Sequence, residues 1–267
     1  RRLAQTLERS VRGHLLSDVP VATFLSGGLD SAVVAAIAAR ATSQMRTFTL
    51  GFADRDLDES AAAEAIARHL GTRHTTVVLG LDDVMHLVPQ ALDAMDLPTM
   101  DGVNTYLISR AVAQTGIKVA LSGLGGDELF GGYPSFTLVP RAARWSFLLG
   151  RCPIRLMGAL AGVTGGRGQR LVGLVRTGAT AEERYEEVRA LWSASELSGL
   201  GLSAGAPSAA WRVTGSSPID ISLLELSGYM RNTLLRDSDA MSMAHSLELR
   251  VPFLDVDLVQ CALDARA

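Results

Sequence analysis

The chain has 267 residues, of which 48% are hydrophobic, and its formal net charge at pH 7 is −3. This length and apolar content allow a sizeable buried core, in one large domain or two modest ones. The slightly acidic balance gives no electrostatic reason to expect a nucleic acid or an anionic membrane surface as a partner. No apolar stretch reaches the roughly 18 residues that a membrane-spanning helix needs. The two cysteines, Cys152 and Cys261, form no CxxC pair of the kind typical of zinc sites.

The start of the chain carries no basic-then-apolar segment of the signal-peptide type and no methionine at Arg1. From this start and from the sparse cysteines we expect a piece of a longer protein that works in the reducing cytoplasm. The sequence leaves the oligomeric state open, a homo-oligomer included.

Two periodicities alternate through the first half of the chain. Four short apolar runs are predicted as buried strands, at residues 21–25, 46–52, 74–79 and 118–122. Helical patterns precede and separate these strands, at residues 3–15, 30–41, 58–70, 82–95 and 103–115. Buried strands separated by such helices indicate βαβ units, and therefore an α/β fold with a mostly parallel sheet and helices on both faces.

The second half of the chain shows only helical patterns, from about residue 136 to residue 248. Its Gly/Ser-rich stretch at residues 198–218 is the predicted flexible loop. Arginines crowd residues 141–176, and we interpret them as a solvated helical surface in preference to a binding patch. We therefore expect residues 1–135 to form an α/β core and residues 136–267 a mainly helical part.

The turn after the first predicted strand reads SGGLDS, residues 26–31, and leads directly into a helix. Glycines let the backbone approach an anion, while free N–H groups and the helix dipole point at it. An ordinary phosphate loop adds a lysine, whereas here Asp30 repels phosphate unless a divalent cation lies between them. Magnesium binds through one or two carboxylates and phosphate oxygens, which suits this arrangement. The weaker alternative is a plain glycine turn in which Asp30 and Ser31 cap the helix.

A second turn of the same kind follows the fourth predicted strand, in LSGLGGDELFGGY at residues 121–133. It again combines Ser-Gly, further glycines and acids, here Asp127 and Glu128. Because ligands of parallel sheets bind beyond the carboxyl ends of the strands, we expect both turns at the same edge. Asp30 and Asp127 would then hold a magnesium-bound triphosphate from both sides.

A third stretch, RNTLLRDSDAMSMAHSLELRVPFLD at residues 231–255, predicts a helix that ends near Leu249, followed by an extended segment. It contains two charged residues, Glu248 and Arg250, at the end of the predicted helix. Packing or charge pairing explains them as well as a functional role does.

Together, SGGLDS, SGLGGDE and SLELRVPFLD resemble, in order and spacing, the synthetase domain of glutamine-dependent asparagine synthetases, whose relatives include β-lactam synthetases and lasso-peptide cyclases. The resemblance covers nearly the whole chain and extends to DVPVATFLSGGLDS, LDESAAAEAIARHLGTRH and GGYPSF. It implies the PP-loop ATP pyrophosphatase fold, of the adenine nucleotide alpha hydrolase-like type, with ATP and Mg²⁺ as cofactors. It also implies a ligase that adenylates a carboxylate, with aspartate as the expected acceptor, releases pyrophosphate and lets ammonia or an amine displace AMP.

The resemblance also implies roles for individual residues. Five residues resemble the pyrophosphate loop, namely Ser26, Gly27, Gly28, Asp30 and Ser31. Four residues match positions that line the adenosine, namely Leu25, Leu50, Ser122 and Gly123. Asp30 and Asp127 match the two magnesium ligands, and the catalytic candidates are Asp127, Glu128 and Arg236.

Three departures from the family pattern bear on the reaction. The resemblance implies an upstream glutamine amidotransferase domain that this sequence does not contain, so the nitrogen source is free ammonia, an amine or a partner segment. The glutamate that asparagine synthetases have in SGxGGDE is Leu124 here, which leaves the acceptor carboxylate open. The Lys or Arg that the family often places before Met-Ser-Met-Ala is Ala240, so a charge role near the leaving group falls to Arg236 first and Arg231 second.

Two further hypotheses stay open, a ligase that joins an amine to a different small or peptide carboxylate, and an ATP-binding scaffold without catalysis. The retained Asp30 and Asp127 favour catalysis, whereas the missing glutamate and lysine favour the scaffold. A tRNA-modifying PP-loop enzyme is a more distant alternative, because such enzymes normally need a basic face and catalytic or zinc cysteines. A polar segment that opens a predicted helix holds either capping residues or candidates to line the acceptor pocket, namely Asp101, Asn104 and Thr105.

Overall fold

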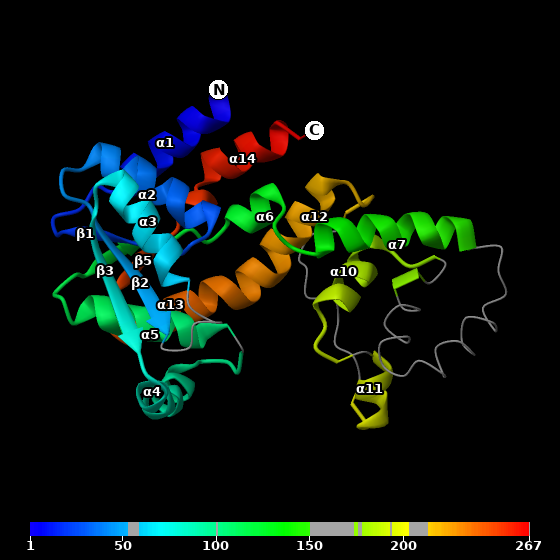
Figure 1. Cartoon of the computed structure of the whole chain (residues 1–267). Helices are drawn as coiled ribbons and strands as arrows, with labels where there is room; N and C mark the ends of the chain where they lie inside the picture. The colour runs from blue at the N-terminus through cyan, green and yellow to red at the C-terminus, as the bar shows by residue number, and fades with distance from the viewer. Residues whose placement is uncertain are drawn as a thin grey trace. The chain divides into compact units, whose positions relative to one another are not determined.

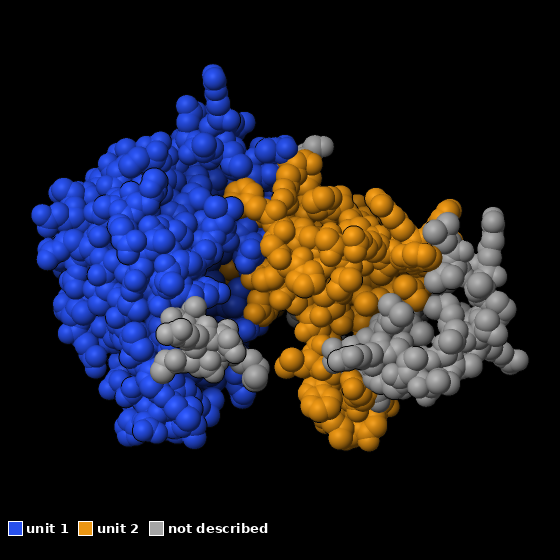
Figure 2. Space-filling view, in the orientation of Figure 1, with its two compact units in different colours: residues 1–129, 233–265 blue, residues 130–232, 266–267 orange. Residues whose placement is uncertain are grey.

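The structure is a computed structural model. It describes residues 1–52, 59–99, 101–149, 174–175, 178–192, 194–202 and 213–266. Two compact units make up the chain (Figure 2): unit 1 is residues 1–129 and 233–265, and unit 2 is residues 130–232 and 266–267. Residues 233–265 thus group with the first part of the chain, whereas the sequence places them in the part after residue 135. They belong to unit 1 because they contribute a strand to its sheet.

The core of unit 1 is a five-stranded sheet in the order β3-β2-β1-β4-β5, in which every pair of neighbouring strands is parallel. Its strands are β1 Val21–Phe24, β2 Arg46–Phe52, β3 Arg73–Leu79, β4 Val119–Leu121 and β5 Glu248–Arg250. The central strand β1 pairs Thr23 with Thr47 of β2 on one side and with Leu121 of β4 on the other. The first four strands match the predicted ones to within a residue at each end. The chain turns from one side of the sheet to the other between β3 and β4, with β1 at the switch.

Helices cover both faces of this sheet (Figure 1), which confirms the predicted α/β class. One face is covered by α2 Leu29–Ala41 and α3 Ser60–Leu70, with α1 Arg2–His14 and α14 Val256–Asp264 packed outside α2 and α1 respectively. The other face is covered by α5 Gly102–Ala113 and α13 Leu235–Met243, with α4 Leu81–Ala94 packed against both. Small side chains let α2 and α3 approach the sheet closely, because Ala35, Ala63 and Ala67 are buried with Leu25.

The fifth strand corrects the helix that the sequence predicts to continue to about Leu249. Helix α13 ends at Met243, and Ser246 adopts a left-handed conformation with φ 53°. The N–H of Leu247 donates to the carbonyl of Ser242 at 3.1 Å, which closes the helix end. The N–H of Glu248 then donates to the carbonyl of Lys118 at 2.8 Å and starts the pairing with β4. Hydrogen bonding to a distant strand thus overrides the local helical pattern.

Unit 2 contains helices and no strand among its described residues, as the sequence predicts for this part of the chain. They are α7 Ser135–Leu149, α10 Ala181–Arg189, α11 Ala194–Gly199 and α12 Pro218–Glu225. Two further helices cross the unit boundary, α6 Gly126–Phe130 and the π-helix η1 Leu226–Leu234, and a 3₁₀ turn, η2, spans Pro252–Leu254 in unit 1. The core of unit 2 holds Val139, Tyr185, Ile221 and Leu224.

Parts of two predictions lie outside the described residues. They are the arginines from Arg151 to Arg176 with Cys152, and residues 203–212 of the predicted flexible loop. Arg141 and Arg144 of α7 are described and are exposed, as expected for a solvated helical surface. None of the described helices is long and apolar enough to cross a bilayer.

Candidate active site

The first glycine-rich turn joins β1 to α2 and is organised by Ser31. The buried Ser31 hydroxyl accepts a hydrogen bond from the N–H of Ser26 at 3.0 Å and lies 2.9 Å from the Ser26 hydroxyl. The N–H of Gly28 donates to the Ser26 hydroxyl at 3.2 Å. Helix α2 begins after Gly28 without a side-chain cap, so its first turn offers backbone donors toward the turn. Residues 26–28 are exposed, which leaves their backbone accessible to a ligand.

The two leucines predicted to line an adenosine are less exposed than this turn. Leu25 is 2% exposed, its N–H donates to Phe48 at 2.8 Å, and its carbonyl accepts from the hydroxyl of Thr49. Leu50, on the neighbouring strand β2, is half-buried and packs against the clusters beneath the sheet. Leu25 therefore holds the backbone from which the turn departs, while its side chain belongs to the core.

The second glycine-rich turn joins β4 to α6. The N–H of Ser122 donates to the carbonyl of Arg250 at 2.9 Å, so the turn departs directly from the β4–β5 pairing. The Ser122 hydroxyl accepts from the N–H of Leu124 at 3.3 Å. Gly125 has φ +99°, and a β-carbon there would lie 2.8 Å from the Leu254 side chain. Glycine at this position therefore serves both the conformation and the packing.

Close packing brings the two turns together, which confirms the expectation that they lie at the same edge of the sheet. A β-carbon on Gly123 would lie 2.7 Å from the backbone nitrogen of Ser31. A β-carbon on Gly126 would lie 2.2 Å from the carboxyl carbon of Asp30. Only glycines allow the β4–α6 turn to lie this close to the start of α2.

This packing places two carboxylates near each other. Burial raises the pKa of Asp30, and the negative charge of Asp127 raises it further. Asp127 is exposed at the start of α6. Two adjacent carboxylates at a solvent-accessible turn favour a cation between them, because it relieves their mutual repulsion.

The donor set fits magnesium in combination with a polyphosphate. Among the described residues, no group of three or more His, Cys, Asp or Glu residues is arranged to hold a metal ion. Mg²⁺ typically takes only one or two protein carboxylates and completes its shell with phosphate oxygens and water. Asp30 and Asp127 meet that requirement without a dedicated protein cage.

The other two catalytic candidates occupy different surroundings. Glu128 is 1% exposed in α6, in contrast to the exposed Asp127 beside it. Arg236 donates to the carboxylate of Asp96 at 3.0 Å, and both side chains are about half exposed. Arg231, the second choice for the charge role, is exposed on η1. The structure therefore brings Asp30 and Asp127 together and holds Arg236 by an acid from the segment after α4.

Sequence reasoning did not single out Asp237. This residue is 4% exposed and accepts a hydrogen bond of 2.6 Å from the Thr99 hydroxyl. Burial raises its pKa, and the Thr99 hydrogen bond opposes that rise. Nearby Gly102 allows α5 to approach α13, since a β-carbon there would lie 3.2 Å from Met241. The acidic run RDSD around Asp237 was the available signal, and its partner lies 138 residues away.

The structure tests, for one residue of the polar segment at the start of α5, whether its side chain caps the helix. Asp101 occupies the N-cap position of α5 but makes no side-chain capping hydrogen bond. Asn104 and Thr105 lie inside the first turn of the helix. Their use in an acceptor pocket stays a prediction.

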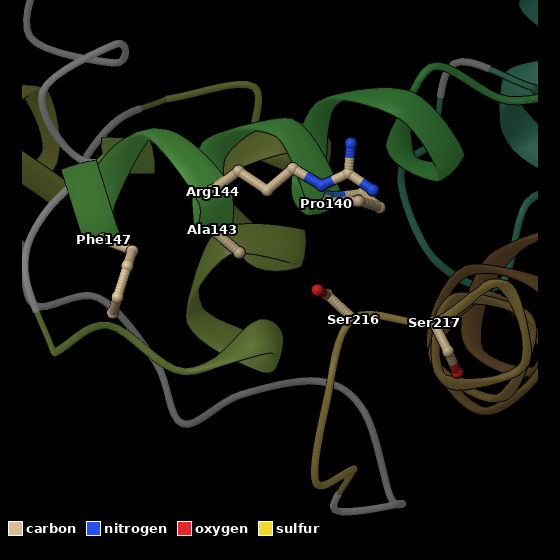
Figure 3. A pocket seen from close by; sticks show the side chains of 6 residues that line it. All are labelled: Pro140, Ala143, Arg144, Phe147, Ser216 and Ser217. Carbon is tan, nitrogen blue, oxygen red and sulfur yellow. The ribbon is translucent and has the colours of Figure 1, made fainter.

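A surface hollow of about 570 Å³ lies in unit 2 (Figure 3), lined by side chains of α7 and by the segment that enters α12. Its lining consists of Pro140, Ala143, Arg144, Phe147, Ser216 and Ser217. None of these residues belongs to the glycine-rich motifs, so the candidate active site remains the two turns of unit 1.

The fold and the two turns define an α/β protein in which two glycine-rich turns meet at one edge of a parallel sheet. Residues 2–267 match the sequence model of the asparagine synthase family, and the chain belongs to that family. A putative glutamine-hydrolysing asparagine synthetase of Mycobacterium bovis is 34% identical over 277 residues, which cover 97% of this chain and 41% of that protein. The glutamine-hydrolysing asparagine synthetase 1 of Bacillus subtilis is 32% identical, over 92% of this chain and 40% of that protein.

A third relative, the glutamine-hydrolysing asparagine synthetase B of Escherichia coli, is 39% identical over 52% of this chain and 28% of that protein. The chain therefore spans well under half the length of these relatives. A solved structure with partial likeness is the NH3-dependent NAD synthetase of Campylobacter jejuni, with a TM-score of 0.36 and 15% identity. The aligned part covers 49% of this chain and 59% of that one, so the fold assignment rests on the parallel sheet of this chain itself.

Proposed function

We propose that this chain is the synthetase domain of an ATP- and Mg²⁺-dependent amide-forming ligase. A carboxylate oxygen of the acceptor attacks the α-phosphorus of ATP, the bond to the bridging oxygen of the β-phosphate breaks, and pyrophosphate leaves. The nitrogen of ammonia or an amine then attacks the acyl carbon, AMP leaves and the nitrogen loses a proton. The observation that carries the proposal is the contact of Gly123 and Gly126 with the start of α2, which sets Asp30 and Asp127 at one edge.

Different residues of the turns bind different parts of ATP in this proposal. The backbone N–H of Gly27 and those of the first turn of α2 bind the pyrophosphate part of ATP. Ser26 and Ser31 hold the turn in shape through their hydroxyl contacts. The adenosine lies along the strand ends at Leu25, Leu50, Ser122 and Gly123, as the family resemblance implies.

Asp30 and Asp127 are the proposed magnesium ligands. A bound Mg²⁺ supplies neutralisation of the charge that develops on the leaving pyrophosphate. Arg236 is the proposed cationic residue for the same leaving group, and Glu128, which is buried in α6, is the third proposed catalytic residue. Burial is the larger cause of the raised pKa of Asp30 and the charge of Asp127 the smaller one, and a cation between the two carboxylates relieves the smaller cause.

The names of the relatives support a proposal for the nitrogen source. The relatives from M. bovis, B. subtilis and E. coli are named as glutamine-hydrolysing. We propose that a glutamine amidotransferase domain supplies ammonia in the full-length protein. Within this chain we propose residues 1–135 as the nucleotide-binding part and residues 136–267 as the part that completes the synthetase domain.

The test is carboxylate-dependent exchange of labelled pyrophosphate into ATP, because exchange requires only the adenylation step. We expect exchange with wild-type protein, and a loss of about 100-fold or more in Asp30→Asn and Asp127→Asn, the scale of a lost electrostatic contact to a transition state. Asp257→Asn, in an exposed ion pair with Arg9, serves as the control that keeps full exchange. ATP binding without exchange for any acid would overturn the catalytic proposal in favour of a scaffold.

A second candidate acceptor class is favoured by one residue. Leu124 stands where asparagine synthetases have a glutamate, and its backbone N–H is held by Ser122. An apolar side chain at this position suits a carboxylate substrate without a free amino group nearby. A panel of acids in the exchange assay separates the two: exchange with aspartate alone supports asparagine formation, and exchange with other acids alone supports the related ligase.

A further inference from the structure

Besides the β4–α6 turn, the start of α3 also packs against the SGGLDS turn. Helix α3 begins at Ser60, with Glu59 as its N-cap residue. A β-carbon on Gly27 would lie 3.0 Å from the β-carbon of Ala62 and 3.7 Å from the Oε2 atom of Glu59. The first turn of α3 therefore packs directly against the SGGLDS turn, and the Glu59 carboxylate lies beside it.

Glu59 is exposed and does not cap its own helix through its side chain. Its carboxylate joins those of Asp30 and Asp127, so acids from three separate elements border the two turns. The carboxylates of Asp30 and Asp127 have a role as proposed metal ligands. The carboxylate of Glu59 lies 3.7 Å from the position of a β-carbon on Gly27, whereas the nearest atoms to a β-carbon on Gly126 are those of Asp30.

We infer that Glu59 is a specificity-determining residue that makes the nucleotide turn select cation-complexed ATP over free ATP. This inference rests on the proposed function, because it assumes that ATP is the ligand. A carboxylate beside the turn repels the phosphates of free ATP. It repels the magnesium complex less, because the cation neutralises part of the phosphate charge. An ordinary phosphate loop has a lysine at the phosphates in place of such a carboxylate.

The test compares Glu59→Gln with wild type in two binding measurements, ATP with excess Mg²⁺ and ATP with EDTA. The readout is the ratio of the two dissociation constants. We expect the ratio of free-ATP Kd to Mg-ATP Kd to fall by about threefold or more in Glu59→Gln. Two unit charges about 7 Å apart, at a dielectric near that of water, interact strongly enough to give a change of this size. The effect shrinks as salt is added, because exposed charges are screened.

Glu64→Gln is the matched control on the same helix. Its carboxylate accepts a hydrogen bond from the Thr76 hydroxyl at 3.0 Å, on the side of β3. We expect this variant to keep the wild-type ratio. Circular dichroism of both variants checks that α3 remains folded.

The outcomes separate this inference from the proposed function. Wild-type protein that binds ATP, together with an unchanged ratio in Glu59→Gln, overturns the role of Glu59 and leaves the proposed function intact. Equal changes in Glu59→Gln and Glu64→Gln also overturn it, because they would reflect net charge alone. No ATP binding by wild type under either condition overturns the proposed function and this inference with it.

Discussion

Carboxylates lie in opposite surroundings in the two units. In unit 2, Glu225 is fully buried and accepts hydrogen bonds from the hydroxyls of Ser135 and Tyr185. It also pairs with Arg189 at 2.6 Å, and the Arg189 guanidinium lies over the rings of Tyr133 and Tyr229, 4.1 and 4.0 Å from their centroids. In unit 1, Asp30 is half-buried and faces the negative charge of another carboxylate.

The difference separates the structural use of a carboxylate, in Glu225, from the functional use that we propose for Asp30. A buried carboxylate with full hydrogen bonding and a cationic partner holds a core together, because removing any partner leaves it uncompensated. A carboxylate beside a like charge costs stability in the free protein and becomes favourable when a cation binds. The predictions below test this contrast in order of expected effect.

The largest effect is expected on removing the partner of Glu225. Arg189→Met leaves a buried carboxylate without its cation and is expected to lower the free energy of unfolding by about 3–5 kcal/mol. Denaturant unfolding measures it. Arg236→Met removes an arginine from the exposed pair with Asp96 and is expected to cost less than about 1 kcal/mol. Equal costs of the two changes would contradict the contrast between buried and exposed pairs.

An effect of intermediate size is expected when the close approach of Gly126 to Asp30 is disturbed. Gly126→Ala adds a β-carbon 2.2 Å from the carboxyl carbon of Asp30, so the side chain or the turn must shift. We expect a loss of about 1–3 kcal/mol, the usual cost of overpacking. Gly13→Ala in α1 meets nothing within 4 Å and is expected to gain up to about 1 kcal/mol from helix propensity. A neutral Gly126→Ala would argue against the described packing of the two turns.

The smallest effect concerns pH. The pKa of Asp30 is raised in the folded protein, so its contribution to stability is present below 3.8 and is lost as pH rises through the raised value. Asp127→Asn removes one cause of the rise and keeps the burial, so the pKa of Asp30 moves part of the way back toward 3.8. Carbon-13 NMR titration of the Asp30 carboxyl measures this shift. Asp257→Asn is the control, and an equal shift in both variants would contradict a local cause.

Local patterns predicted most of unit 1. The strands β1 to β4 are short apolar runs bounded by turn residues. The helices around them show apolar spacing or, in α2, apolar residues on most faces, so each element could be predicted without its neighbours. Strand β5 could not, because Glu248–Arg250 is only three residues long and mixes charged and apolar side chains. Its pairing with β4 is set by a hydrogen-bond partner far away in the sequence. The end of α13 was also missed, because no glycine or proline stands at Ser246 to mark it.

The two turns of the candidate site could be predicted from the sequence, whereas the contacts of Glu59 and Arg236 near it could not. Strand-then-glycine spacing predicted that the turns with Asp30 and Asp127 share an edge, and the packing of Gly123 and Gly126 confirms it. Their roles as magnesium ligands stay a prediction. The proximity of Glu59 to Gly27 and the pairing of Arg236 with Asp96 join residues about 30 and 140 positions apart, and no periodicity carries such information.

The pairing of β5 with β4 has a consequence for how the protein is made. Val119 pairs with Glu248 across about 130 residues, and residues 130–232 of unit 2 lie between them. At ribosomal rates of about 5–20 residues per second, β4 waits about 6 to 25 s for its neighbour after it has been synthesised. Throughout this interval the β4 edge is open, and the anchor of the Ser122 turn on Arg250 does not yet exist. The two glycine-rich turns therefore acquire their final shape only late in translation, after residues 130–232 of unit 2 have been synthesised.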